Sequence, residues 1–436
     1  MKRTVIIPLL IGALPACGQE AWTVERCMQY AVEHNHEVRL QALALDDRNA
    51  LRRQAVGAFL PQVEASTSGQ YNFGRAIDPE TNTYTDVSTF YNGYGLSASL
   101  PLFDGMRRLH ELRMARADVL MGRNALQAER DRVALAVMQS YADVLYYQGT
   151  VAMTECKQSQ SRLMLQQTES MYEVGTKGMP DVAQMRAQLA ADDLELTRHR
   201  NLLAQAMLRL RQEMALDTAS VSLCLVPLGR SLPPVAPDKA ATADDRLPEL
   251  MQARFAVESA RHAYRAARSQ LFPTLSVGAG ISTTYYKTLH ADGASAFSDQ
   301  LRHNAGHYVY ATLSVPLFGR LQSLTRLRRQ RNALLMAQER MAQKSQEMRR
   351  LLAEADMECE GARREALQTQ ARVEADSLAL SLATRQYELG LASPLDVSAS
   401  AAQLWQSRAQ LLRSHLTCLL KNRLSRYYRG ESLWTE

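Results

Sequence analysis

The segment VGTKGMPDV, residues 174–182, lies between two long polar stretches that have the composition of helices. A second segment, LGLASPLDV at residues 389–397, repeats its glycine, aspartate and valine at a constant offset, since 390 − 175, 396 − 181 and 397 − 182 all equal 215. A turn that recurs at so long an interval indicates a duplicated structural unit rather than a chance match.

Further landmarks repeat in the same order. SLPLF at residues 99–103 returns as SVPLF at residues 314–318, again shifted by 215. LPQVEAS, which starts at Leu60, matches FPTLSVG, which starts at Phe272, with a shift of 212. The offset therefore grows by three residues between these landmarks, which places a small insertion in one loop of the second copy.

The duplication divides the mature chain into two repeats, residues 19–215 and 246–436. Residues 216–245 join them as a linker or equatorial segment rich in proline and alanine, and a short strand is expected near residues 221–226. Each repeat should contain a helix, two strands and a long helical hairpin, because the hydrophobic period changes within each repeat.

Residues 1–18 have a basic start, an apolar run and small residues at the end, as a secretory signal peptide does. Two processing routes are open. The signal is cleaved after Gly18, or a lipid is attached at Cys17, because LPAC resembles a bacterial lipobox.

Two segments of each repeat alternate between apolar and polar residues, as strands with one apolar face do. The expected strands cover about residues 62–73, 91–100, 274–286 and 307–315. The polar, turn-rich segments between paired strands are expected to be long exposed hairpin loops. Proline cannot donate to a ladder, so four prolines should mark junctions between strands and helices: Pro61, Pro101, Pro273 and Pro316.

Long helices account for most of the remaining sequence. From about residue 105 to 171 apolar residues recur every seven positions, and the second repeat has an equivalent stretch. Sustained heptads indicate coiled coils, and at 1.5 Å per residue each helix reaches about 100 Å. The heptad positions are Leu112, Val119, Leu126 and Val133, then Leu327, Leu334, Met341, Met348, Ala355 and Ala362. Shorter returning helices are expected at about 181–212 and 396–428.

Several function classes find no support in the sequence. The net charge of +6 is spread among acidic residues and forms no basic stripe, which argues against nucleic-acid binding. The six cysteines show no zinc spacing, and no catalytic grouping, phosphate loop or ligand cluster occurs. We therefore expect no enzyme, no cofactor and no metal site.

The strands limit the possible architectures. After the signal peptide no apolar run reaches the roughly 18 residues of a transmembrane helix, so strands would have to span a membrane. Four strands cannot close a barrel alone, two chains would enclose little more than side chains, and three chains would leave a lumen. The expected fold is mainly α with a membrane β-barrel portion, built from duplicated repeats of coiled-coil helices and two strands each.

The residues resemble those of the TolC-like outer-membrane efflux proteins. The resemblance spans essentially the mature chain and rests on the PLF strand exits, the LPQ and FPT strand entries, the YEVG and YELG turns, and the opening AWTVERCMQYAVEHNHEV. It implies a homotrimer in the outer-membrane lipid of a Gram-negative bacterium, with twelve strands in one barrel and a periplasmic α-helical tunnel. It also implies two partners, a periplasmic adaptor (membrane fusion protein) and an inner-membrane transporter.

The resemblance implies a function and a set of site residues. The chain would be the passive exit duct of a tripartite efflux pump or type I secretion system. The hairpin tips that meet the adaptor would comprise Val174, Gly175 and Thr176, and Leu389, Gly390 and Leu391. Asp181 and Asp396 would surround the periplasmic aperture, although each also suits a plain helix start.

This sequence departs from the family pattern at two positions near the second tip. Ala392 stands where an arginine can latch the closed mouth, and Ala399 where a second acidic ring can lie. A periplasmic coiled-coil adaptor or structural protein of the envelope is the alternative function. It would explain the heptads, but it would not need four alternating strands.

Overall fold

The computed structural model describes residues 21–77, 82–86, 88–216, 223–228, 246–289, 296–319 and 321–433. The expected signal peptide with Cys17, and most of the expected linker, lie outside these residues. Two compact units divide the chain. The helical unit contains residues 1–41, 126–247 and 346–436, and the sheet unit contains residues 42–125 and 248–345.

The helices confirm the mainly α fold and show the duplication directly. The long helices α3 and α7 each have 67 residues, and the returning helices α4 and α8 each have 35. Their bounds are Arg107–Glu173 for α3, Met179–Glu213 for α4, Gln322–Glu388 for α7 and Pro394–Tyr428 for α8. The other helices are α1 Val24–His34, α2 His36–Gly57, α5 Pro248–Ser269 and α6 Phe297–His303. None of the helices described is both long and apolar enough to cross a membrane.

The compact units do not coincide with the sequence repeats. Each unit combines corresponding pieces of both repeats, because the chain passes from one unit to the other within α3 and again within α7. The duplication therefore produces two similar halves that share both units, rather than two separate domains.

The core of the helical unit contains every residue of the predicted heptad stripe that lies in this unit. Five stripe residues in this unit are buried: Leu126, Val133, Met348, Ala355 and Ala362. Two short strands, β1 (Ala21–Trp22) and β6 (Cys224–Leu225), pair in parallel. The buried hydroxyl of Tyr141 on α3 lies 2.6 Å from the carbonyl oxygen of Val226 and 3.0 Å from that of Trp22. This tyrosine therefore holds the β1–β6 pair against the helices.

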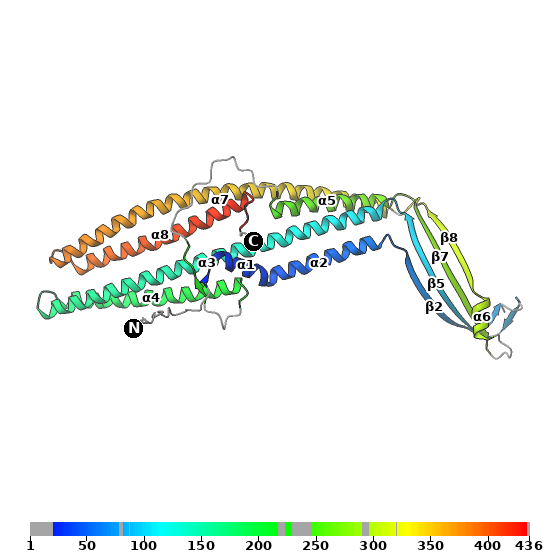
Figure 1. Ribbon diagram of the computed structural model, residues 1–436, viewed down its shortest axis with the longest axis horizontal. Coiled ribbons are helices and arrows are strands. Elements are labelled where there is room, and N and C mark those ends of the chain that lie inside the picture. The colour runs from blue at the N-terminus through cyan, green and yellow to red at the C-terminus, as the bar shows by residue number, and fades with distance from the viewer. Residues whose placement is uncertain are drawn as a thin grey trace, which may run out of the picture. The chain divides into compact units, whose positions relative to one another are not determined.

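The sheet unit contains four antiparallel strands in the order β2-β5-β7-β8 (Figure 1). Their bounds are β2 Gln62–Asn72, β5 Thr89–Phe103, β7 Thr274–Thr288 and β8 Gly306–Ser314. The register aligns the predicted apolar residues across all four strands, and one such row is Val63, Ala98, Ala279 and Val309. Residues opposite one another share a face, so one face is apolar and the other is rich in glycine, serine and threonine.

The structure corrects two expectations about the strands. β5 continues to Phe103, so Pro101 lies inside the strand, but the register with β7 shifts between Pro101 and Phe103. Such an irregularity accommodates a residue that has no backbone N–H. The segments expected as plain loops also contain regular structure, namely the β3–β4 hairpin (Arg75–Ile77, Tyr84–Asp86) and helix α6. Pieces this short carry too few residues for a periodic signal.

A buried ion pair fixes the junction between β5 and α3. The Asp104 carboxylate accepts a 2.9 Å bond from Nε of Arg108, whose Nη1 donates to the carbonyl oxygen of Ala58 at 3.0 Å. Gly105 between them has a φ of +66°, and a Cβ there would lie 2.6 Å from the carbonyl oxygen of Ser269. Glycine is therefore required where the chain turns from the sheet into the long helix.

Candidate functional site at the hairpin tips

Backbone hydrogen bonds close the first tip at the turn that the sequence predicts. α3 ends at Glu173, the Thr176 N–H donates to the carbonyl oxygen of Met171 at 2.9 Å, and the Gly175 N–H donates to that of Tyr172 at 2.9 Å. This pair of bonds defines a Schellman motif, which satisfies the last carbonyl groups of a helix. The second tip repeats it, with Leu391 donating to Gln386 at 2.8 Å and Gly390 to Tyr387 at 3.0 Å.

Both tip glycines have a left-handed backbone. The φ angle is +82° at Gly175 and +75° at Gly390. A Cβ at either position would meet nothing within 4 Å. The requirement for glycine is therefore conformational and not steric, so a substitution here strains the turn without displacing neighbours.

Asp181 and Asp396 each bind the start of the helix that follows the turn. The Asp181 carboxylate accepts from the Gly178 N–H at 3.2 Å. The Asp396 carboxylate accepts from the Ser393 hydroxyl at 2.7 Å and from the Ser393 N–H at 2.9 Å. These bonds, led by the one from the hydroxyl, hold the pKa of the Asp396 carboxyl below its ordinary value. In the single chain both aspartates are helix caps that remain at least partly accessible.

Both turns lie at one end of the helical unit (Figure 1), and their apolar side chains are exposed. Val174 is 80% exposed, Leu389 is 66% exposed and Leu391 is 77% exposed. The valines that follow the capping aspartates, Val182 and Val397, are instead buried at 2%. The repeated turn therefore combines an inward valine that anchors the hairpin with an outward apolar tip.

Tyr387 joins the two hairpins just above the second tip, and sequence reasoning missed it. Its ring is 3% exposed, and its hydroxyl lies 3.2 Å from Oγ1 of the fully buried Thr168 on α3. The Lys177 ammonium from the first turn lies 5.1 Å from the centre of the ring. The tyrosine at the matching position, Tyr172, is 46% exposed, so the two equivalent tyrosines have different surroundings.

A buried charged cluster lies between α3 and α4. Asp192 is fully buried and accepts from Ser161 at 2.5 Å and from Gln188 at 2.9 Å, and Lys157 lies 3.0 Å away. Lys157 also donates to Glu195 at 2.6 Å. Burial acts to lower the pKa of Lys157, but the hydrogen bonds to Glu195 and Asp192 and their charges outweigh it and raise that pKa.

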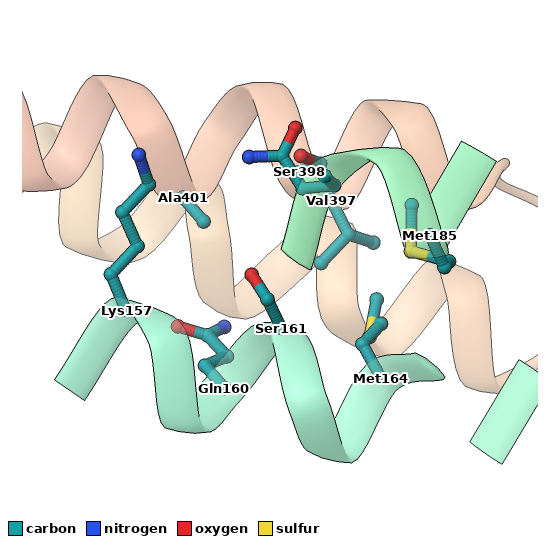
Figure 2. A pocket seen from close by; sticks show the side chains of 9 residues that line it. Lys157, Gln160, Ser161, Met164, Met185, Val397, Ser398 and Ala401 are labelled. Atoms are coloured by element: carbon teal, nitrogen blue, oxygen red, sulfur yellow. The ribbon is translucent and has the colours of Figure 1, made fainter. Parts of the chain in front are cut away.

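A small cavity adjoins this cluster, where α8 meets the first hairpin (Figure 2). Its volume of about 20 Å³ is enough for one water molecule. Three helices line it with Lys157, Gln160, Ser161 and Met164 of α3, Met185 and Gln188 of α4, and Val397, Ser398 and Ala401 of α8. The polar cluster therefore lies at a junction between the hairpins as well as within one of them.

The 215-residue offset contained a signal for this cluster. It relates Ser161 to Asp376, since 376 − 161 = 215, and Asp192 to Ser407, since 407 − 192 = 215. In the first hairpin the serine is on α3 and the aspartate on α4, whereas in the second hairpin the aspartate is on α7 and the serine on α8. Ser407 is fully buried, as Asp192 is. The repeat comparison could have singled out this polar layer, but buried charges do not show in a heptad pattern.

The fold is that of outer-membrane channels with a helical tunnel. The solved structure of CusC, described as a transmembrane channel, matches with a TM-score of 0.83 at 18% identity over 94% of this chain and 92% of CusC. The outer membrane protein VceC from Vibrio cholerae matches with a TM-score of 0.81 at 15% identity over 94% of this chain and 96% of VceC.

The chain belongs to the outer membrane efflux protein family, which it matches over residues 27–215 and 241–419. It is similar to the outer membrane efflux protein BepC of Brucella suis, with 22% identity over 91% of this chain and 83% of BepC. It is also similar to the probable outer membrane lipoprotein SilC of Salmonella typhimurium, with 24% identity over 60% of this chain. That second match spans 55% of SilC. Family membership places the chain among outer membrane efflux proteins.

Proposed function

We propose that three copies of the chain form the outer-membrane exit duct of a tripartite efflux pump or type I secretion system, through which solutes pass without chemical change. The observation that carries this proposal is the open four-stranded sheet. In the described residues β2 pairs only with β5, and β8 pairs only with β7, so both edges of the sheet lack a partner. Unpaired strand edges are not tolerated in lipid.

Closure by three chains satisfies these edges. β8 of one copy would pair with β2 of the next, and three 4-stranded sheets give twelve strands, enough to leave a lumen. Every residue of β8 is exposed in the single chain, including Val309 at 84% and Leu313 at 66%. The apolar face would then contact lipid, and the face of glycine, serine and threonine would line water.

The hairpin tips fit a docking role toward a periplasmic adaptor. Two similar turns per chain give six tips in a trimer, each presenting an apolar residue next to a glycine with a positive φ angle. Exposed apolar residues gathered at one end mark a protein-interaction surface. The adaptor would bring the inner-membrane transporter to this end. The tip contacts are assigned to Val174, Gly175 and Thr176, and to Leu389, Gly390 and Leu391.

The aspartates near the tips would act as caps and as an aperture ring together. A carboxylate that accepts hydrogen bonds from a helix start keeps its negative charge and can still attract cations. Six such groups, from Asp181 and Asp396 of three chains, would make the periplasmic entrance favour cations.

Processing of the N-terminus remains a prediction with two outcomes. Lipid attachment at Cys17 would anchor the trimer in addition to the barrel, and SilC, a relative, is named a probable lipoprotein. Cleavage after Gly18 would leave no lipid. The mass of the purified mature protein distinguishes the two.

Conductance across a lipid bilayer tests the proposed function. Protein extracted from the outer membrane should insert into a planar bilayer and give discrete, ohmic current steps, because a twelve-stranded barrel leaves an aqueous path. A host strain that lacks the chain should also become more sensitive to exported toxic compounds, and the plasmid-borne gene should restore resistance. Insertion without current would contradict the duct, and so would full resistance in the deletion strain. The alternative, a soluble periplasmic adaptor, predicts no insertion at all.

A further inference from the structure

Helix α6 packs against β7 at the end of the sheet that is remote from the start of α3 (Figure 1). The Phe297 ring lies 5.0 Å from that of Tyr285 and 6.3 Å from that of Tyr94, centre to centre. Leu96 and Ile281 are paired on the apolar face. Tyr94 lies two residues from Leu96 and Tyr285 lies four residues from Ile281, so both tyrosines share that face, because alternate residues of a strand point to the same side. The three rings therefore form one aromatic cluster on the apolar face.

Hydrogen bonds fix α6 along the edge of β7, beyond the end of β8. The Gln300 side chain accepts from the Tyr286 N–H at 2.8 Å and donates to the Tyr286 carbonyl oxygen at 2.9 Å, as a paired strand would. The Asn304 side chain donates to the Thr284 carbonyl oxygen at 2.8 Å. α6 thus takes the place of β8 on the last part of β7, and its orientation is set by specific bonds.

Basic residues occur on β7 and α6, the two elements that also carry Tyr285 and Phe297. Lys287 follows Tyr285 by two residues on the same face of β7 and is exposed. Arg302 and His303 are exposed in the last turn of α6, which also carries one acidic residue in its first turn, Asp299. The site therefore carries a net positive charge beside aromatic rings at the remote end of a membrane strand.

Aromatic rings concentrate at the boundary between hydrocarbon and headgroups, and basic residues next to them attract anionic lipids. The tunnel helices are periplasmic, so the end of the sheet that carries α6 lies at the outer leaflet. We propose that α6 and the adjoining end of β7 bind a phosphate-bearing lipid headgroup of the outer leaflet, with Lys287 and Arg302 contacting phosphate and Phe297 seated at the headgroup boundary. The site rests on the proposed barrel, whose apolar face contacts lipid.

Lipid A, which carries two phosphates in the outer leaflet, is the probe. Trimer purified in a zwitterionic detergent is titrated with lipid A dissolved in micelles of the same detergent, and bound lipid is counted by native mass spectrometry. The Lys287→Gln/Arg302→Gln variant removes two charges and should need about thirty-fold more lipid A for half-saturation. The Arg162→Gln/Arg385→Gln variant removes two exposed charges from the helices and should match the wild type.

Lipid A binding tests this inference, whereas assembly and conductance test the proposed function. Equal lipid A binding by the wild type and the Lys287/Arg302 variant would overturn the lipid site, and so would an equal loss in the control variant. All three proteins should remain trimeric and conduct in planar bilayers. A wild type that neither assembles nor conducts would contradict the proposed duct itself. If native mass spectrometry of the wild type shows a tightly bound protein and no bound lipid A, α6 has a protein partner and the proposal is overturned.

Discussion

Replacing Lys157 by methionine tests whether the buried cluster holds the hairpin together. The side chain of Lys157 is 16% exposed and that of Asp192 only 1%, so solvent screens their interaction weakly. Methionine has a similar length but no charge, so it leaves Asp192 buried without its cation. The Ser161 and Gln188 hydrogen bonds would remain and soften the effect.

The expected loss is large. Removing one member of a buried ion pair costs about 3–5 kcal/mol, and the two remaining hydrogen bonds favour the lower end of that range. A loss of about 3 kcal/mol corresponds to roughly a hundredfold increase in local opening. The Lys157→Met/Asp192→Leu variant removes both charges and should recover most of the loss, because apolar replacement of a buried pair is often neutral.

Hydrogen exchange on the detergent-solubilised trimer measures this opening directly. Backbone amides of α4 that flank Asp192 should exchange about a hundred times faster in the Lys157→Met variant than in the wild type. The matched control breaks the exposed pair of Arg200 and Glu155, whose side chains are 60% and 48% exposed. The Arg200→Gln change should alter exchange in the same helix by less than about fivefold.

The pH dependence has a defined sign. The folded-state pKa of Lys157 is raised, so its contribution to stability is complete below the unfolded-state value of about 10.4 and disappears as pH rises through the folded-state value. The wild type should therefore lose protection near Asp192 in strong alkali, and the Lys157→Met variant should not show this loss. Unchanged exchange in the single variant at neutral pH would refute the role assigned to the cluster.

Three further predictions concern the tips. Gly175→Val and Gly390→Val should each strain a left-handed turn by about 1–2 kcal/mol. Export should fall, measured as increased sensitivity of the host to exported solutes, while the trimer persists. Normal export in both variants would argue against docking at the tips. The Asp181→Asn/Asp396→Asn variant should keep its caps but lose cation selectivity and block by divalent cations in planar bilayers, and identical recordings would reduce both residues to caps. Tyr387→Phe removes the hydroxyl bond to α3, about 1 kcal/mol, and should speed amide exchange beside it severalfold; unchanged exchange would show that this bond does not couple the hairpins.

Periodicity and the repeat predicted most of the architecture. The apolar rows of the sheet follow from the strict alternation of apolar and polar residues. Once two antiparallel strands are paired, the register fixes the face on which each side chain lies. The sequence also predicted the two tip turns. Only glycine adopts a φ near +80° freely, and two glycines at the repeat offset mark two equivalent turns. Long helices with heptads carry a strong and redundant signal.

Other features depend on contacts that sequence does not encode locally. The sequence predicts a loop where the structure has helix α6. This seven-residue helix is held in place by Gln300 and by aromatic rings of β5 and β7, and these contacts come from distant parts of the chain. Tyr387 is buried while its repeat equivalent Tyr172 is exposed, so equivalent positions in the two repeats are packed differently. The capping role of Asp181 was foreseen, but a role at the aperture depends on neighbouring chains.

The number of chains in the membrane-extracted particle tests the central claim most directly. Each chain supplies a 4-stranded sheet with two unpaired edges, so the smallest barrel with an aqueous lumen contains three chains. Native mass spectrometry of protein extracted from the outer membrane in detergent should give three times the mass of the mature chain, with neither monomer nor dimer as the main species. A stable monomer that still conducts in a planar bilayer would contradict the account, because four strands cannot close around a water-filled pore.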